Sequence, residues 1–267
     1  MTVPPIDFAR YPVEIPEEAA EIAASARAAL DRDQYCSLPG FFPAEAVRGV
    51  AAEVEALIGR ANPAKSRRNC YLQRQGNPDY PADHPRNIMQ PASYRMLPAD
   101  VLPENSPLKR LYFWEPFQRL VAEIVGEAKL YPSEDTLQPV NVICYGDGDQ
   151  SAWHYDSTNA FTMTLMLQAA EAGGEFELAP NTRASAEDED IPYMREVLGG
   201  ASPRARKVSR DPGELTIFRG CNSLHRVSPV AGDRLRLMAV FVYEDRPGVM
   251  GDPEVNLTVY GRTGREG

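Results

Sequence analysis

The sequence predicts an all-β core with a helical N-terminal extension, which makes the chain α+β. Two observations predict this arrangement. Apolar residues recur at helical spacing in the first part of the chain, whereas short runs with period-two alternation follow from about residue 131. Turn-forming residues separate these short runs, a pattern typical of an antiparallel sandwich or barrel. We therefore expect a helical extension over residues 1–130 that packs on a β core over residues 131–267.

Three segments of the extension are predicted to be helices. Residues 16–32 are Ala-rich with two glutamates in the first turn, which suits the positive end of a helix. The segment that Pro43 opens carries the clearest apolar stripe at helical spacing. Residues 108–127 form a third amphipathic pattern that ends near Gly126. Residues 62–107 are rich in Pro, Asn, Arg and Asp, so we expect long loops there.

Seven short strands are expected in the core. Their predicted ranges are 138–145, 152–156, 162–167, 174–178, 214–218, 225–227 and 235–243. Turn sequences such as Gly146-Asp147-Gly148-Asp149 and Asp211-Pro212-Gly213 separate them. A charged insert at 181–210 interrupts the pattern, and we expect either a mobile flap over the site or a solvated excursion.

Composition excludes several classes of partner. The formal net charge is −10 over 267 residues, and an acidic surface repels phosphate backbones and anionic membranes. No signal pattern precedes the first helix, and no apolar run is long enough to cross a bilayer. Four scattered cysteines without a paired motif fit a reducing cytoplasm. We expect a cytoplasmic protein with no nucleic-acid or membrane partner.

The strongest functional signal is Trp153-His154-Tyr155-Asp156, followed much later by Ser223-Leu224-His225-Arg226-Val227. Residues two apart on a strand point to the same face, so His154 and Asp156 can bind one ion together. His225 would complete a set of two imidazoles and one carboxylate. This set leaves metal positions open, as non-haem Fe(II) oxygenases require. Either histidine alone would more often be a satisfied core or surface residue.

The surroundings of these residues strengthen the interpretation. The strand Gly173-Gly174-Glu175-Phe176-Glu177-Leu178 follows at a hairpin, and Pro212-Gly213-Glu214-Leu215-Thr216-Ile217-Phe218 leads to His225. Over residues 131–247 this succession resembles the Fe(II)/2-oxoglutarate-dependent dioxygenase superfamily. The resemblance implies a double-stranded β-helix, also called a jelly roll or cupin-type fold. It also implies that His154, Asp156 and His225 bind Fe(II), with 2-oxoglutarate and O₂ as cosubstrates.

The far carboxylate of 2-oxoglutarate needs a cation, and arginine binds a carboxylate through two parallel hydrogen bonds. Arg234, just after the Gly232-Asp233 turn, matches the arginine of the superfamily. Arg236 lies on the same face of that predicted strand and is the second candidate. Tyr145, or Asn141 on the same strand, could donate a hydrogen bond to the cosubstrate.

Within the superfamily, the chain most resembles the branch that contains free-amino-acid hydroxylases and radical halogenases. The resemblance rests on the helical extension, on the sequence around His225, and on Tyr243-Glu244-Asp245-Arg246-Pro247-Gly248-Val249. Radical halogenases have Gly or Ala in place of the metal-binding carboxylate, which leaves room for chloride. The presence of Asp156 therefore favours hydroxylation, or a related C–H oxidation such as desaturation or ring closure.

The expected substrate is a small polar metabolite, most simply a free amino acid or a derivative. A polar loop could supply the substrate-binding groups, and within it Arg86 is the first candidate; Glu134 is a second. Two alternatives stay open. A peptidyl or protein hydroxylase would need an open groove rather than a closed pocket. A non-catalytic cupin-like protein would retain the metal for structure only.

Overall fold

A seven-stranded antiparallel sheet forms the larger half of the β core in this computed structural model, which describes residues 3–156 and 161–264. The strand order is β1-β10-β6-β13-β5-β3-β2. Its strands are β1 (Tyr35–Leu38), β2 (Asn62–Arg68), β3 (Gln90–Leu97), β5 (Val140–Tyr145), β6 (Thr162–Gln168), β10 (Leu215–Phe218) and β13 (Arg236–Phe241). The ends of the two expected parts, residues 1–2 and 265–267, lie outside the described residues.

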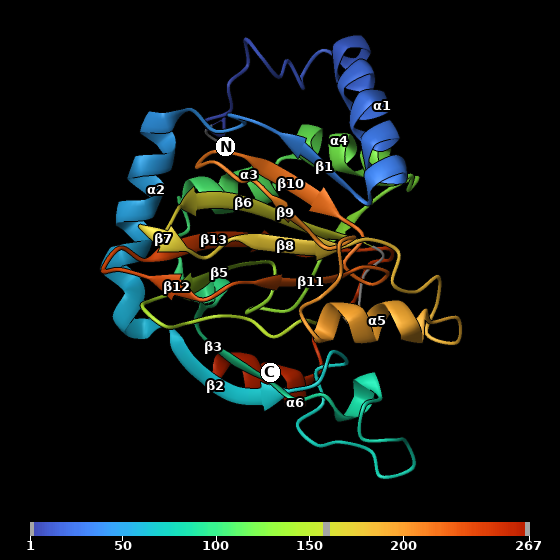
Figure 1. Cartoon of the computed structure of the whole chain (residues 1–267). Helices are drawn as coiled ribbons and strands as arrows, with labels where there is room; N and C mark the ends of the chain where they lie inside the picture. Colours follow the sequence, from blue (N-terminus) through green and yellow to red (C-terminus); the bar gives the residue numbers. More distant parts are fainter. Residues whose placement is uncertain (1–2, 157–160, 265–267) are drawn as a thin grey trace.

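A smaller sheet faces the large one and has the order β11-β8-β9 (Figure 1). Its strands are β8 (Phe176–Ala179), β9 (Arg206–Val208) and β11 (Leu224–Val227). Two short pairs complete the core: β7 (Ala172–Gly173) with β12 (Val230–Ala231), and β4 (Tyr131–Pro132) with β14 (Tyr243–Glu244). Two facing antiparallel sheets are the jelly-roll architecture expected from the sequence.

Helices cover the outer face of the large sheet, because alternate residues of each strand point to opposite faces. On β6, Met163, Leu165 and Leu167 belong to the main apolar core, which the N-terminal helices share. These helices are α1 (Pro16–Asp33), α2 (Ala44–Leu57), α3 (Pro107–Tyr112) and α4 (Glu115–Val125). Thr164 on β6 points instead into the space between the sheets, where its hydroxyl contacts Arg210.

Two expectations for the N-terminal part need correction. Residues 62–107 are not all loop, since β2 and β3 pair along their whole length and β3 joins β5 in the large sheet. β2 is the edge strand and is half exposed. Its sequence is therefore polar and contains Lys and Pro, a composition that predicted a loop. The segment expected to be one helix at 108–127 forms two helices. Pro116 has no backbone N–H to donate to the Tyr112 carbonyl, so one continuous helix cannot form. Gly126 does end α4, with φ 87°.

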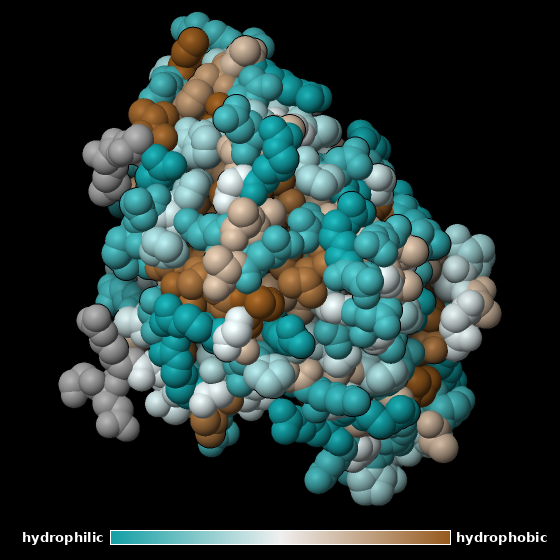
Figure 2. Space-filling model, turned by 90° about the vertical axis from the view of Figure 1, so that its left-hand side faces the viewer, coloured by the Kyte–Doolittle hydropathy of each residue, from teal (hydrophilic) through white to brown (hydrophobic). Residues whose placement is uncertain are grey.

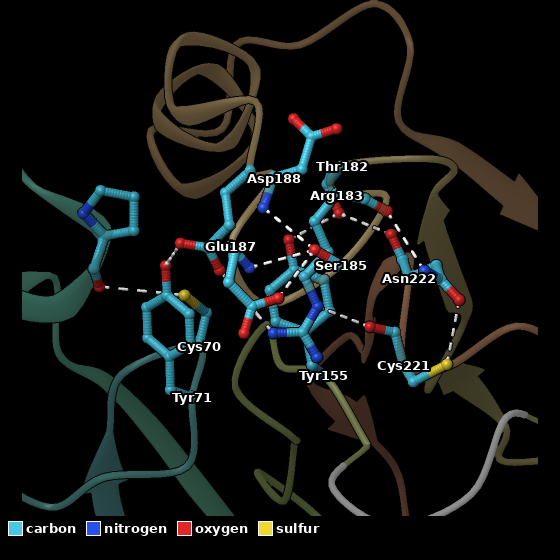
Figure 3. Close-up of polar contacts among 12 residues, drawn as sticks. Cys70, Tyr71, Tyr155, Thr182, Arg183, Ser185, Glu187, Asp188, Cys221 and Asn222 are labelled. Atoms are coloured by element: carbon cyan, nitrogen blue, oxygen red, sulfur yellow. Dashed lines mark hydrogen bonds and ion pairs between the residues drawn. The ribbon is translucent and has the colours of Figure 1, made fainter.

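The insert at 181–210 is also more ordered than expected. It contains α5 (Ile191–Leu198) and ends in β9, which pairs with β8. Tyr193, Met194 and Val197 of α5 pack in one apolar cluster with Trp153 and Tyr155. The guanidinium of Arg183 lies 3.8 Å from the centre of the Tyr155 ring, and the Tyr155 hydroxyl donates to Thr182 (Figure 3). The insert is therefore anchored to the core through α5 and β9, while residues 184–188 are exposed.

The C-terminal helix α6 (Pro253–Tyr260) packs against β2 and β3, below the sheets in Figure 1. Short 3-10 helices lie at η1 (Ile58–Arg60), η2 (Pro85–Asn87) and η3 (Ala99–Val101). Among the described residues, no helix is both long and apolar enough to span a membrane. The face seen from the α2 side is mostly hydrophilic, with apolar residues in limited areas (Figure 2).

Candidate metal centre

The three residues singled out in the sequence meet at one end of the two sheets. His154 and His225 pair through their backbones, each N–H donating to the carbonyl of the other at 3.0 and 3.1 Å. The expected strand at 152–156 is reduced to this single bridge. Asp156 Oδ1 lies 3.7 Å from His154 Nε2, and its Oδ2 lies 3.4 Å from His225 Nε2. Candidate ligand atoms of all three residues lie within 4.8 Å of one another.

Backbone carbonyls orient both imidazole rings. Nδ1 of His154 lies 2.8 Å from the Ala152 carbonyl, and Nδ1 of His225 lies 3.0 Å from the Ser223 carbonyl. A carbonyl only accepts, so each Nδ1 carries a proton, and in the neutral form of the ring Nε2 then keeps its lone pair. Both lone pairs are thus available on the side that faces Asp156. This is the usual outer hydrogen bonding of a metal-binding histidine.

Electrostatics favour the protonation states that bind a cation. Burial, followed by the neighbouring His225, lowers the pKa of His154 to about 4, so this imidazole is neutral at pH 7. Burial alone would raise the pKa of Asp156, but His225, His154 and the Thr162 hydroxyl together hold it below its ordinary value. A neutral imidazole and an ionised carboxylate are the forms that ligate a metal. The donor set fits a divalent metal with open positions.

A cavity of about 610 Å³ opens beside His154 and Asp156. Its walls come from β2, β3, β5 and α6, and from the loop after β2. Its polar lining includes Arg68 and Arg74 on one side and Asp252 and Glu254, at the start of α6, on another. Aromatic and apolar side chains complete the walls, among them Tyr71, Tyr94, Met96, Ile143 and Tyr145.

Sequence comparison assigns the family. The sequence matches the family described as Halogenase D over residues 18–251, which is most of the chain. The chain belongs to the Halogenase D family. This agrees with the branch that the motifs indicated, which includes radical halogenases. No curated protein matches the sequence.

Solved structures share the fold of this Halogenase D family member. An oxidoreductase of the 2OG-Fe(II) oxygenase family from Burkholderia pseudomallei has a TM-score of 0.52 at 16% identity, covering 85% of this chain and 92% of that one. A Trichoplax adhaerens prolyl hydroxylase, in complex with a peptide fragment, scores 0.55 at 15%, covering 86% and 91%. HygX from Streptomyces hygroscopicus, with nickel, 2-oxoglutarate and hygromycin B bound, scores 0.54 at 12%, covering 82% and 86%. These likenesses confirm the fold expected for the superfamily.

The two candidate arginines of the Halogenase D family chain lie in different places. Arg234 is exposed, donates to the Ala170 carbonyl at 3.0 Å, and lines a separate cleft beside α2. Arg236 is 2% exposed and lies between the sheets, opposite Tyr145 in the register of β13 and β5. The two side chains do not share a face because β13 begins only at Arg236, so Arg234 belongs to the preceding turn.

Arg236 fits closely against the hairpin before β8. Its Nε donates to the Gly174 carbonyl at 2.8 Å. A side chain at Gly174 would come within 2.9 Å of Arg236 Cδ, and the backbone there has φ +63°. Glycine at this position therefore admits the arginine side chain and permits the backbone conformation.

The two candidate substrate-binding residues are not part of the cavity lining. The Arg86 guanidinium stacks over Tyr71, 4.2 Å from the ring centre, because its loop folds back on itself. Glu134 is exposed and accepts from the Gly248 N–H. Neither residue lines the cavity beside His154, whereas Arg68, from the same polar segment as Arg86, does. Arg68 is 9% exposed, and its charge acts on His154.

Proposed function

We propose that this chain is an Fe(II)- and 2-oxoglutarate-dependent oxygenase that hydroxylates an unactivated C–H bond of a small polar metabolite, such as a free amino acid or a derivative. The observation that carries the proposal is the convergence of His154, Asp156 and His225, with both Nε2 atoms directed at one carboxylate. Such a set binds Fe(II) and leaves open positions for 2-oxoglutarate and O₂. The fold shared with 2OG-Fe(II) oxygenases supports it.

Asp156 supports hydroxylation over halogenation, although the family is described as Halogenase D. Radical halogenases of the resembling branch have Gly or Ala here and place chloride on the metal. In this chain the carboxylate is held in place, since its backbone N–H donates to Gly220 and its side chain accepts from Thr162. Chloride and this carboxylate would compete for one position. Desaturation and ring closure use the same metal set and are separated from hydroxylation by the product.

For the cosubstrate we propose Arg236 rather than Arg234. Arg236 is a buried cation without an ion-pair partner among the described residues, which supports an anionic ligand beside it. Tyr145 lies opposite it, with the guanidinium 5.5 Å from the ring centre, and lines the cavity of the candidate metal centre. A buried arginine and a tyrosine hydroxyl suit the far carboxylate of 2-oxoglutarate.

For the substrate we propose Arg68 as the carboxylate-binding residue. Its Nε donates to Ser66, and the guanidinium lines the cavity close to His154. Asp252 and Glu254 line the same cavity and suit a substrate ammonium group. Groups of both signs in one cavity support a zwitterionic substrate. A peptide would require an open groove, whereas α6 and the loop after β2 line this cavity from two sides.

In the proposed reaction, each of these residues would have one role. His154, Asp156 and His225 hold the metal, and Arg236 neutralises the cosubstrate. When bound, Fe(II) with 2-oxoglutarate and O₂ supplies the oxidising chemistry, which releases succinate and CO₂. Arg68 fixes the substrate so that one C–H bond faces the metal, and the apolar walls keep water out. No acid–base pair is needed.

Two measurements test the proposal. Anaerobic Fe(II) and 2-oxoglutarate should give a weak visible charge-transfer band with the wild type and none with His225→Ala. Succinate release should then be screened across free amino acids, with peptides as a parallel set, and the product of any hit weighed in the presence of chloride. A product that gains one oxygen supports hydroxylation, and a chlorinated product contradicts it. If the wild type forms no band and releases no succinate with any substrate, the proposed oxygenase function fails.

We also propose a cytoplasmic location. All four cysteines are unpaired, and three of them are buried. Unpaired buried thiols suit a reducing compartment.

A further inference from the structure

A second arginine, Arg210, lies between the two sheets close to Arg236, in a segment whose charged sequence predicted a flap or a solvated excursion. It lies two residues after the end of β9 and so closes the insert at 181–210. Its Nη1 donates to the Thr164 hydroxyl at 3.2 Å. Its Nε and Nη2 are buried and have no hydrogen-bond partner among the described residues. Buried guanidinium N–H groups without partners are unusual and call for an explanation.

Two aromatic rings, those of Phe176 and Phe218, connect Arg210 to the candidate metal centre. Its guanidinium lies 3.5 Å from the centre of the Phe176 ring and 5.2 Å from that of Phe218. Both rings contact the imidazole of His225, with centres 5.8 and 4.9 Å away. Phe176 is two residues from Gly174, whose carbonyl accepts from Arg236. The two arginines therefore border the same end of β8.

The charges of this region are unbalanced. Burial, and then the neighbouring Arg236, lower the pKa of Arg210 to about 9, so Arg210 stays charged at pH 7. Arginine is effectively always protonated in proteins, so Arg236 is charged as well. Neither has an ion-pair partner among the residues that the structure describes; Glu214, whose charge acts on Arg210, accepts from the Asp211 N–H instead. Two buried like charges repel, and an anion between them would relieve the repulsion.

The free edge of Arg210 identifies the kind of anion. Nε and Nη2 form one of the two edges of a guanidinium that bind a carboxylate through parallel hydrogen bonds. We propose that Arg210 and Arg236 together clamp the far carboxylate of 2-oxoglutarate, an inference that rests on the proposed function. Arg210 does not line the cavity assigned to the substrate, which favours the cosubstrate as its ligand. The insert would thus complete the cosubstrate site.

Binding measurements on the Fe(II)-loaded protein under anaerobic conditions test this inference. We compare wild type with Arg210→Met, Arg210→Lys and the control Arg234→Met, which makes the same change at an exposed position. The ligands are 2-oxoglutarate and 2-oxovalerate, which has the same chain length but no far carboxylate. Arg210→Met should weaken 2-oxoglutarate binding by about tenfold or more, because hydrogen bonds to a charged group are lost. It should leave 2-oxovalerate binding unchanged.

Thermal unfolding provides a second readout. Without ligand, Arg210→Met should unfold at the wild-type temperature or above it, because an unpaired buried charge is removed. The stabilisation that 2-oxoglutarate gives should shrink. Arg210→Lys keeps the charge but not the two-pronged edge, so its affinity should be intermediate.

The outcomes separate the two proposals. Equal 2-oxoglutarate affinity in wild type and Arg210→Met would overturn the clamp and leave the proposed function intact. An equal loss for both ligands would also overturn it, since Arg210 would then act on the metal-binding end or on the fold. If the wild type binds no 2-oxoglutarate, the proposed function fails and the clamp fails with it.

Discussion

Gly220 lies against the carboxylate of Asp156 so closely that no larger residue fits. The Gly220 carbonyl accepts the Asp156 N–H at 3.1 Å. A methyl group at Gly220 would overlap Asp156 Oδ2 and Thr162 Oγ1 and would stand 3.0 Å from Asp156 Cγ. The turn before β11 thus sets the position of a candidate ligand that lies five strands earlier in the sequence. The contacts with Gly220 and Thr162 therefore hold the Asp156 carboxylate in place.

Replacing Gly220 should therefore damage the metal centre without touching a ligand. Gly220→Ala should weaken Fe(II) or Co(II) binding by about tenfold or more, as losses of outer-shell support do. Gly49→Ala is the matched control, since nothing lies near that position in α2 and alanine favours helix. Calorimetric titration with the metal checks the prediction. Wild-type affinity in Gly220→Ala would show that Asp156 does not depend on this contact.

The two candidate arginines predict opposite outcomes for the cosubstrate. Arg236→Met should raise the KM for 2-oxoglutarate by about tenfold or more, because a buried charge-assisted contact is lost. Arg234→Met should leave that KM unchanged, because Arg234 bonds only a surface carbonyl among the described residues. Succinate release at varied 2-oxoglutarate measures both. The reverse order would return the role to Arg234.

Arg68 and Arg86 form a second matched pair. Arg68→Ala should raise the substrate KM by about tenfold while leaving 2-oxoglutarate affinity unchanged, because Arg68 lines the cavity. Arg86→Ala should leave the substrate KM unchanged and cost about 0.5–1 kcal/mol of unfolding free energy through the lost stacking on Tyr71. Steady-state kinetics and urea unfolding provide the two readouts. A rise in KM only for Arg86→Ala would contradict the assignment.

Glu189 joins the insert to the loop after β2. Its carboxylate accepts from the Tyr71 hydroxyl at 2.8 Å and lies 3.7 Å from Arg183 Nη1 (Figure 3 shows Tyr71 and Arg183). Glu189→Ala should lower the unfolding free energy by about 1–3 kcal/mol, because Tyr71 and Arg183 lose the acid that they contact in a largely buried network. Limited proteolysis should then cut faster within residues 181–210.

The control for this change is Glu187→Ala, two residues away. Its side chain is exposed and, within residues 3–156 and 161–264, bonds only Ser185 in its own turn. Surface substitutions of this kind change the unfolding free energy by less than about 0.5 kcal/mol. If Glu189→Ala behaves like Glu187→Ala, the insert is held by the packing of α5 alone.

Several elements could be predicted because their signal is local. The apolar stripe of α2, the turn residues between strands and Gly126 at the end of α4 each act through neighbouring residues. β2 could not be predicted from local pattern, because an edge strand is stabilised by pairing with β3 and exposes one polar face. The break between α3 and α4 was open to prediction, since Pro116 forbids a continuous helix.

The sequence by itself determined the β-rich core, the helices of the extension, and the candidate metal-binding set of His154, Asp156 and His225. A metal site of this kind would limit the residue types, and strand spacing limits their placement. Tertiary structure decided which arginines lie inside. Arg234 and Arg236 are two residues apart and would share one face of a continuous strand, but only Arg236 is on the strand and buried. Arg210 sits in a charged insert that looked solvated, yet β9 pairs with β8 and carries its guanidinium between the sheets. Charge in the sequence does not reveal burial, since burial depends on which distant strands pair.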